Sequence, residues 1–223
     1  MLLLAILVLI CVVVILYLRS LFPVISQSFD EVYELAQTGD IIYFIHEHSY
    51  SFFKYIRPFM SHVAMVVVSP KTNEKYVIEI HAKGDKKCLG VNKKSGIHIY
   101  PLKWRIKRYL GCVYLAKLNY KLSIENIKQF INNIKDYQNN IPFDESFKIT
   151  GCKKLLFGVN INKDHKMFCT EFVGFCLQKL SVIQNYHHIT LPIDFLFLQD
   201  SRSKKLYTQF YKIDETLHNY INS

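Results

Sequence analysis

Residues 61–68 read Ser-His-Val-Ala-Met-Val-Val-Val, and residues 76–81 read Tyr-Val-Ile-Glu-Ile-His. Both runs are rich in β-branched residues, which is typical of buried strands. The polar stretch between them contains a proline and an asparagine, two residues that favour turns. We therefore predict a β-hairpin, with His62 near the start of its first strand and Glu79 inside its second.

The register of this hairpin decides whether its polar side chains meet. If position 62 lies opposite 81, then 64 lies opposite 79, and His62, Glu79 and His81 share one face. Glu79 is then diagonal to His62, within reach of a carboxylate–imidazole hydrogen bond. A slip of one residue turns His62 to the other face. His81 shares a face with Glu79 in either register and is the alternative partner. The competing interpretations are an ordinary core histidine and a surface carboxylate.

A second stretch, residues 168–177, reads Phe-Cys-Thr-Glu-Phe-Val-Gly-Phe-Cys-Leu and has the apolar spacing of a helix. Cys169 stands at its start, where the positive end of the helix dipole favours a thiolate. A free cysteine is often simply a small buried residue, and we assign Cys176, deeper in the same helix, to the core. Thiol, imidazole and carboxylate are the parts of a cysteine nucleophile site, here in the chain order His62, Glu79, Cys169.

Helices on both sides of this strand-rich region predict an α+β fold with an antiparallel sheet. Residues 28–31 read Ser-Phe-Asp-Glu, a capping-box pattern that predicts a short helix over 29–36. Apolar residues at spacings of three and four predict an amphipathic helix behind Ser123. The predicted divisions are residues 1–20, an anchor; 21–36, a linker and short helix; 37–200, the catalytic domain; and 201–223, a basic tail.

The N-terminal segment is apolar, because residues 1–18 contain no charged side chain and Arg19 is the first. At a rise of about 1.5 Å per residue this run approaches the hydrocarbon thickness of a bilayer. It lacks the basic start and small-residue cleavage site of a signal peptide. We therefore predict one transmembrane helix, with the lipid membrane as a partner. The positive-inside rule places the basic remainder in the cytosol, as in a single-pass membrane protein.

The composition excludes several classes of protein. Half of the residues are hydrophobic, which argues against disorder. The formal charge of +10 is spread along the chain, which fits a solvated surface or attraction to an anionic membrane. No nucleic-acid-binding motif accompanies the charge, so no nucleic-acid partner is expected. The six cysteines form no CxxC pair, which favours reduced thiols in the cytosol.

The remaining histidines and acids are weaker candidates for chemistry. His46 and His48 have the spacing of a metal pair, but no further carboxylate or cysteine follows at ligand spacing. We therefore expect no metal site and no cofactor. Residues 187–188 are two histidines in a polar stretch. Asp40 follows a glycine at the start of an apolar run and is interpreted as a turn residue.

Five short motifs follow one another along the chain. They are residues 39–44 (Gly-Asp-Ile-Ile-Tyr-Phe), 61–66 (Ser-His-Val-Ala-Met-Val), 77–79 (Val-Ile-Glu), 168–173 (Phe-Cys-Thr-Glu-Phe-Val) and 191–195 (Leu-Pro-Ile-Asp-Phe). Together they resemble the permuted papain-like cysteine hydrolases of the NlpC-type superfamily. That superfamily has bacterial amidase-like, lecithin:retinol acyltransferase-like and poxvirus branches. The resemblance covers about residues 37–197.

This resemblance implies a circularly permuted papain-like fold, in which the antiparallel sheet packs against the helix that starts with the nucleophile. It implies Cys169 as nucleophile, His62 as base and Glu79 as the third polar group. The acyltransferase-like branch uses a second histidine as its third group, which keeps His81 open. The predicted N-terminal anchor departs from most bacterial members, so their substrates transfer poorly.

The leading hypothesis is a membrane-anchored cysteine hydrolase or acyltransferase that cleaves an amide, ester or thioester through an acyl-enzyme on Cys169. The anchor, the basic charge and the aromatic residues favour an acyl or peptidyl substrate that is lipid-linked or membrane-proximal. The alternative is a membrane-tethered structural or interaction protein that has lost catalysis, against which the intact triad argues. A third hypothesis is a basic module that binds membrane surfaces or nucleic acid, with salt-sensitive affinity.

Overall fold

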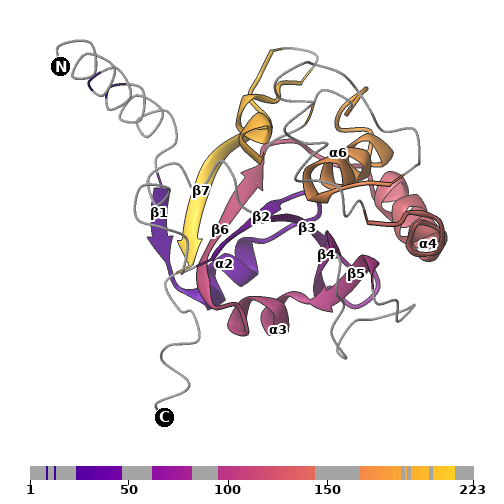
Figure 1. The fold of residues 1–223 in the computed structure, drawn as a ribbon, viewed down its shortest axis with the longest axis horizontal. Helices are drawn as coiled ribbons and strands as arrows, with labels where there is room; N and C mark the ends of the chain where they lie inside the picture. The colour runs from indigo at the N-terminus through magenta and orange to yellow at the C-terminus, as the bar shows by residue number, and fades with distance from the viewer. Residues whose placement is uncertain are drawn as a thin grey trace.

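The computed structural model describes residues 9, 13, 24–46, 62–81, 95–143, 166–186, 189, 192–200 and 203–213. Seven strands in these residues form one sheet in the order β1-β7-β6-β2-β3-β4-β5 (Figure 1). In chain order, the elements are β1 (Val24–Gln27), α2 (Phe29–Leu35), β2 (Ile41–His46), β3 (His62–Val68), β4 (Lys75–His81), β5 (Gly96–Pro101), α3 (Leu102–Lys107), β6 (Gly111–Leu118), α4 (Ile124–Asn140), α6 (Cys169–Lys179), the 3-10 helix η3 (Pro192–Phe197) and β7 (Tyr207–Ile213).

The sheet is mixed, which corrects the prediction of an antiparallel sheet. β1 runs parallel to β7. The other five neighbouring pairs are antiparallel. The prediction failed at this edge because the first described strand pairs with the last. The hydrophobic pattern within either segment carries no information about so distant a partner.

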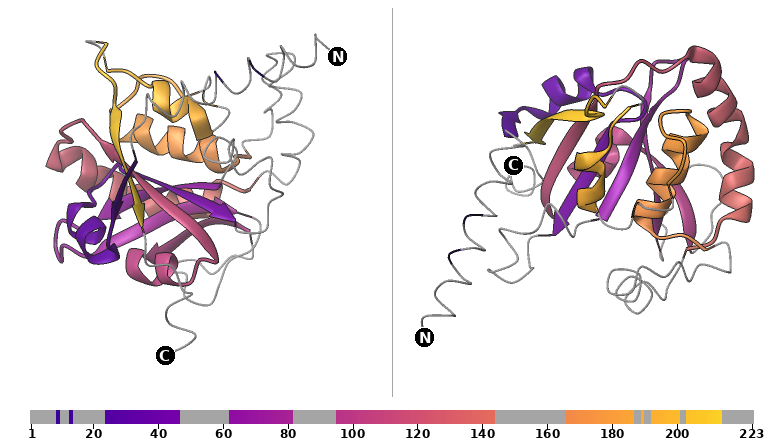
Figure 2. Two further views of the ribbon diagram at one scale, coloured as in Figure 1. Left: turned by 90° about the vertical axis from the view of Figure 1, so that its left-hand side faces the viewer. Right: turned by 90° about the horizontal axis from the view of Figure 1, so that it is seen from above.

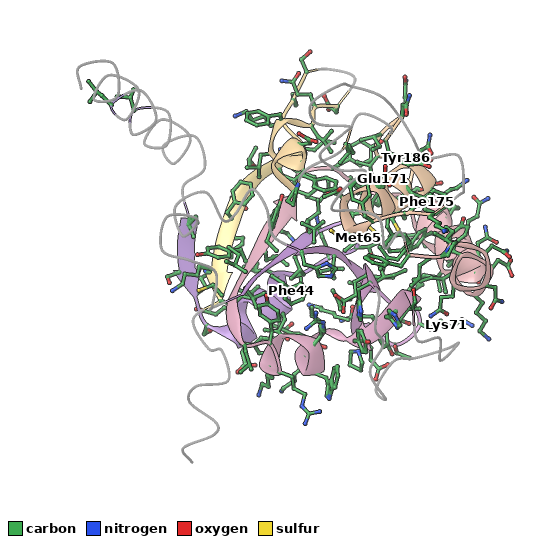
Figure 3. The ribbon with its side chains drawn as sticks, viewed as in Figure 1. Phe44, Met65, Lys71, Glu171, Phe175 and Tyr186 are labelled. Atoms are coloured by element: carbon green, nitrogen blue, oxygen red, sulfur yellow. The ribbon has the colours of Figure 1, made fainter. Side chains whose placement is uncertain are left out.

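Helices cover both faces of the sheet (Figures 1 and 2). α6 packs on β3 and β4, where Met65 belongs to the same apolar core as the helix. α2 and α3 lie on the other side, in a second core that includes Phe44 and Val66. Figure 3 shows Phe44 and Met65 on opposite sides of the strands. Because both faces are buried, β3 and β4 read as nearly continuous apolar runs.

Two predicted helices are confirmed together with their caps. α2 follows Ser28, whose hydroxyl accepts a hydrogen bond from the N–H of Glu31 at 3.4 Å. The Glu31 carboxylate accepts in turn from the N–H of Ser28 at 3.0 Å, which completes the predicted capping box. α4 follows Ser123, whose hydroxyl accepts from the N–H of Asn126 at 3.1 Å. Each such cap stabilises its helix by about 1 kcal/mol.

The basic segment after residue 200, predicted as a tail, contains the strand β7. This strand pairs with β6 on one side and with β1 on the other. Tyr207 and Ile213 are buried, and the hydroxyl of Tyr207 donates to the carbonyl of Gly39 at 2.9 Å. The register shifts between Lys117 and Leu118 on the facing strand. A shift of this kind breaks the alternation of buried and exposed residues that makes a strand recognisable in sequence.

The predicted N-terminal transmembrane helix is contradicted. No helix within the described residues is both long enough and apolar enough to cross a membrane. The single-pass membrane location is corrected on the same finding. Of the predicted anchor, residues 1–20, all but Leu9 and Val13 lie outside the described residues. The prediction rested on length and apolar composition, which do not measure what a segment packs against.

Candidate active site

The β3–β4 hairpin brings His62 and Glu79 into contact. Met65 lies opposite Ile78, and this register, extended along the two strands, sets position 62 opposite 81, which is the register that places His62, Glu79 and His81 on one face. The Nε2 atom of His62 lies 2.7 Å from Oε2 of Glu79. The Glu79 side chain is completely buried, whereas that of His62 is 27% exposed. The imidazole therefore reaches the surface of the protein while its carboxylate partner does not.

Cys169 is the first residue of α6, and its thiol is hydrogen-bonded to the imidazole of His62. Because Nε2 of the imidazole faces the carboxylate, Nδ1 is the nitrogen left for the sulfur. The backbone N–H groups of Val63 and Thr170 also donate to the sulfur. Phe168, which precedes the helix, provides no side-chain cap. The positive end of the helix dipole therefore acts on the thiol without a competing acceptor from that side chain.

The electrostatics of the three groups favour an ion pair. Burial lowers the pKa of His62, but hydrogen bonds to Cys169 and Glu79 and the charges of both outweigh it and raise the pKa to about 9. Burial raises the pKa of the Cys169 thiol, but the hydrogen bond and charge of His62 give a net lowering. Both shifts favour a thiolate beside an imidazolium at neutral pH.

Arg105, on α3, is a site residue that the sequence analysis missed. Its Nε donates to Oε1 of Glu79 at 2.6 Å, and its Nη2 donates to Oε2 at 3.2 Å. Burial raises the pKa of Glu79, but His62 and Arg105 hold it well below its usual range. No motif marks Arg105, because it lies 26 positions from Glu79 in the chain and on a helix of only six residues.

His81, the alternative third residue, lies beside Glu79. Its Nε2 is 3.7 Å from Oε1 of that carboxylate, beyond normal hydrogen-bond distance. Its ring stacks on His98, with 4.3 Å between the ring centroids. Burial lowers the pKa of His81 to about 4 and also lowers the pKa of His98. Both rings are therefore neutral at neutral pH, and Glu79 is the group that meets the imidazole of His62.

Other residues singled out in the sequence lie away from this contact. Cys176 is completely buried in the core as predicted, and burial raises the pKa of its thiol. Asp40 accepts hydrogen bonds from the N–H groups of Gln37 and Leu118, each at 2.8 Å, which confirms its interpretation as a turn residue. The side chain of His46 and residues 48, 187 and 188 lie outside the described part of the chain. Within the described part, no group of three or more metal-ligating side chains is placed to hold a metal ion.

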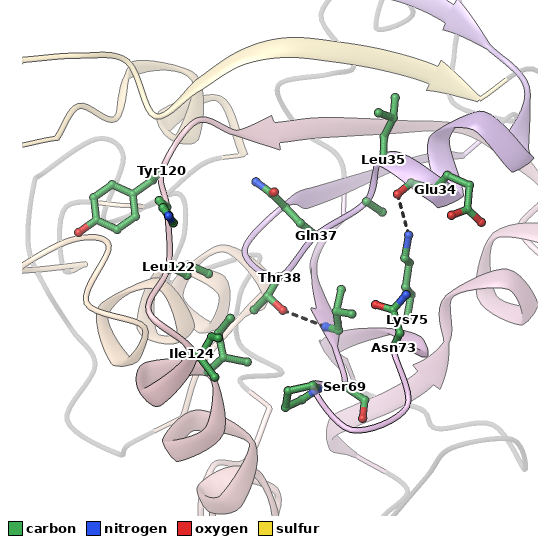
Figure 4. A pocket seen from close by; sticks show the side chains of 15 residues that line it. Glu34, Leu35, Gln37, Thr38, Ser69, Asn73, Lys75, Tyr120, Leu122 and Ile124 are labelled. Carbon is green, nitrogen blue, oxygen red and sulfur yellow. Dashed lines mark hydrogen bonds between the residues drawn. The ribbon is translucent and has the colours of Figure 1, made fainter.

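A separate cavity of about 520 Å³ opens at the other end of the hairpin (Figure 4). The end of α2, the β3–β4 turn and the segment between β6 and α4 line it. Two of its polar side chains form hydrogen bonds to the backbone. The hydroxyl of Thr38 accepts from the N–H of Val68 at 2.9 Å, and the ammonium of Lys75 donates to the carbonyl of Glu34 at 2.8 Å. The residues of the thiol site are not among its lining residues.

Comparisons with known proteins give limited help. No protein-family model matches the chain, and no curated protein matches it. Among solved structures, the chain is similar to the metalloprotein YiiX from Escherichia coli O157:H7, described as DUF1105, with 24% sequence identity and a TM-score of 0.41. The match covers 67% of this chain and 68% of that chain. A similarity of this size carries no argument about the chemistry of the site.

Proposed function

We propose that this protein is a cysteine hydrolase or acyltransferase in which Cys169 attacks the carbonyl carbon of an amide, ester or thioester. The proposal rests on one observation: the imidazole of His62 is hydrogen-bonded to the thiol and lies 2.7 Å from the buried carboxylate of Glu79. Kinship with the NlpC-type cysteine hydrolases belongs to the same proposal. It rests on the ordered sequence motifs around these three residues.

The chemistry follows from the roles that the three groups can take. The thiolate of Cys169 adds to the carbonyl carbon, and the backbone N–H of Cys169 stabilises the resulting oxyanion. The imidazolium of His62 gives its proton to the leaving amine, alcohol or thiol, which leaves an acyl-enzyme. Glu79 stays ionised and fixes the orientation and tautomer of the ring.

Breakdown of the acyl-enzyme separates the two forms of the activity. In a hydrolase, neutral His62 takes a proton from the water that attacks the thioester, and the thiolate leaves. In an acyltransferase, an alcohol or amine takes the place of water. The substrate class is therefore an acyl or peptidyl carbonyl compound. The preference for a lipid-linked substrate rested in part on the membrane anchor and is not kept.

An acyl-trapping experiment tests this function. The full-length protein is mixed with p-nitrophenyl acetate, release of p-nitrophenolate is followed, and the acylated residue is located by peptide mass spectrometry. We expect a burst of p-nitrophenolate and acetyl on Cys169. Cys169→Ser loses the burst, whereas the matched control Cys112→Ser, at an exposed cysteine, retains it. Acetylation unaffected by Cys169→Ser contradicts the proposal and favours an interaction protein without catalysis.

A further inference from the structure

Arg105 binds both oxygens of the buried carboxylate behind the thiol site. Nε contacts Oε1 of Glu79 and Nη2 contacts Oε2, the oxygen that also faces His62. The carboxylate is completely buried, and the Arg105 side chain is 19% exposed. An Arg–carboxylate pair with two contacts fixes the plane of the carboxylate as well as its charge. The position of Oε2 against the imidazole is therefore set from α3.

Aromatic side chains hold the guanidinium of Arg105 in place. Its Cζ lies 4.3 Å from the ring centroid of Phe44 and 5.5 Å from that of Tyr109. These two rings pack on one another with their centroids 4.9 Å apart. Gly111 allows this packing, because a Cβ at position 111 would lie 2.9 Å from Cε1 of Tyr109. A cation held by two rings and a carboxylate has little freedom to turn.

We propose that Arg105 is a positioning residue of the thiol site, one that acts on Cys169 through Glu79 and His62. The inference rests on the proposed function of that site. During acyl transfer the imidazolium of His62 gives up its proton to the leaving group, and Glu79 then loses the positive charge of one of its two hydrogen-bonded partners. The guanidinium stays charged throughout. Arg105 therefore keeps the buried carboxylate ionised and oriented until His62 is protonated again.

The surroundings of Glu79 give this role a definite pH dependence. The titratable and charged groups around it are His62 on β3, His81 on β4, His98 on β5, and Arg105 and Tyr109 from α3 and the turn after it. Without Arg105, a buried carboxyl takes up a proton at higher pH. Below that pH His62 loses its anionic partner, and the thiolate of Cys169 is lost with it. In a plot of the alkylation rate of Cys169 against pH, the acid limb, where the rate falls as the thiolate is lost, therefore moves toward neutral pH.

The test is the pH profile of Cys169 alkylation by iodoacetamide in the full-length protein. In Arg105→Met we expect the acid limb to move up by about one pH unit, which is about a tenfold loss of rate on that limb. Arg105→Lys keeps the charge but loses the two-contact geometry, so a smaller shift in the same direction is expected. The matched control is Arg108→Met, at the exposed end of the same helix, where Arg108 lies over Trp104. It should leave the profile unchanged.

A double-mutant cycle separates positioning from simple stabilisation. In a Glu79→Gln background, Arg105→Met should cause little further change in the profile, because the group through which it acts is gone. A wild-type acid limb in folded Arg105→Met overturns the proposal, as does an equal shift in both backgrounds. If Arg105→Met does not fold, an unshifted Arg105→Lys overturns it. If wild-type Cys169 itself reacts as an ordinary thiol, the proposed function fails instead, so the two failures are distinguishable.

Discussion

Cys169 and Glu79 belong to opposite sides of one sheet, and both contact His62. Cys169 begins α6, which packs on the side of Met65, whereas Glu79 meets Arg105 on the side of α3. His62 is the first residue of β3, and the end of a strand is where groups from both faces can meet. The buried carboxylate and the thiol therefore reach the imidazole of His62 from opposite sides of the sheet.

Replacement of Glu79 by glutamine tests the third member of the site. Glutamine carries no charge, so the pKa of His62 should fall and that of the Cys169 thiol should rise. We expect kcat/KM for an activated ester to fall by about 10²-fold to 10⁴-fold. His81→Gln is the comparison variant, because the ring of His81 lies 3.7 Å from the same carboxylate and edge-to-face with the ring of His62, with 6.2 Å between the ring centroids. A larger loss in His81→Gln than in Glu79→Gln would assign the orienting role to His81.

Replacement of Gly111 by alanine tests the packing that supports Arg105. Gly111 has φ of 149°. An added Cβ would lie 2.2 Å from the carbonyl oxygen of Ile45. Because that oxygen belongs to the backbone, the clash can be relieved only if β2 shifts against β6. We expect a loss of roughly 3 kcal/mol in the free energy of unfolding, measured by urea denaturation.

Gly96→Ala is the matched control for this substitution. Gly96 also has a positive φ, 121°, but an added Cβ would meet its nearest neighbour only at 3.5 Å. It should therefore show the cost of the backbone conformation alone, about 1 kcal/mol. Equal losses for the two variants would mean that the contact with Ile45 does not limit the approach of the strands.

Replacement of Asp40 by asparagine tests a pH-dependent contribution to stability. Burial raises the pKa of Asp40 to about 6, against the lowering effect of Lys117 3.1 Å away. In an unfolded chain an aspartate has a pKa of about 3.9, so the folded state binds the proton more tightly. The proton bound by Asp40 thus contributes to the free energy of unfolding in full below pH ~4, and this contribution is lost as the pH rises through about 6.

Asparagine does not titrate and should lack this dependence. Relative to wild type, Asp40→Asn should gain about 2 kcal/mol on going from pH ~4 to pH ~7.5, measured by urea denaturation at the two pH values. Asp136→Asn, at an exposed position within α4, is the control and should follow wild type. If the free energies of unfolding of Asp40→Asn and wild type differ by the same amount at both pH values, the raised pKa of Asp40 is contradicted.

The sequence predicted the hairpin of the site because the signal there is local: two β-branched runs flank one polar turn. It set Glu79 and His81 on one face but left open the register that brings His62 to that face, which the pairing of Met65 with Ile78 supplies. The start of α6 at Cys169 was equally local, since the apolar spacing of a helix begins there. These parts of the candidate site needed no knowledge of the rest of the fold.

The parts that sequence reasoning missed depend on distant contacts. Arg105 meets Glu79 only after α3 has packed on the sheet, and β7 becomes a strand by pairing between β1 and β6. The predicted anchor is corrected because no helix within the described residues is long and apolar enough to cross a membrane. Its prediction rested on length and apolar composition alone.

The most direct test of the thiolate–imidazolium pair is the alkylation rate of Cys169 across pH with limiting iodoacetamide. Peptide mass spectrometry reads each of the six cysteines separately. We predict that the pH profile of Cys169 in the wild type lies below that of an ordinary thiol, because His62 lowers the pKa of this thiol, and that His62→Ala moves the profile up toward pH 8.5. A wild-type Cys169 that titrates near pH 8.5, or a profile unchanged by His62→Ala, would contradict the account.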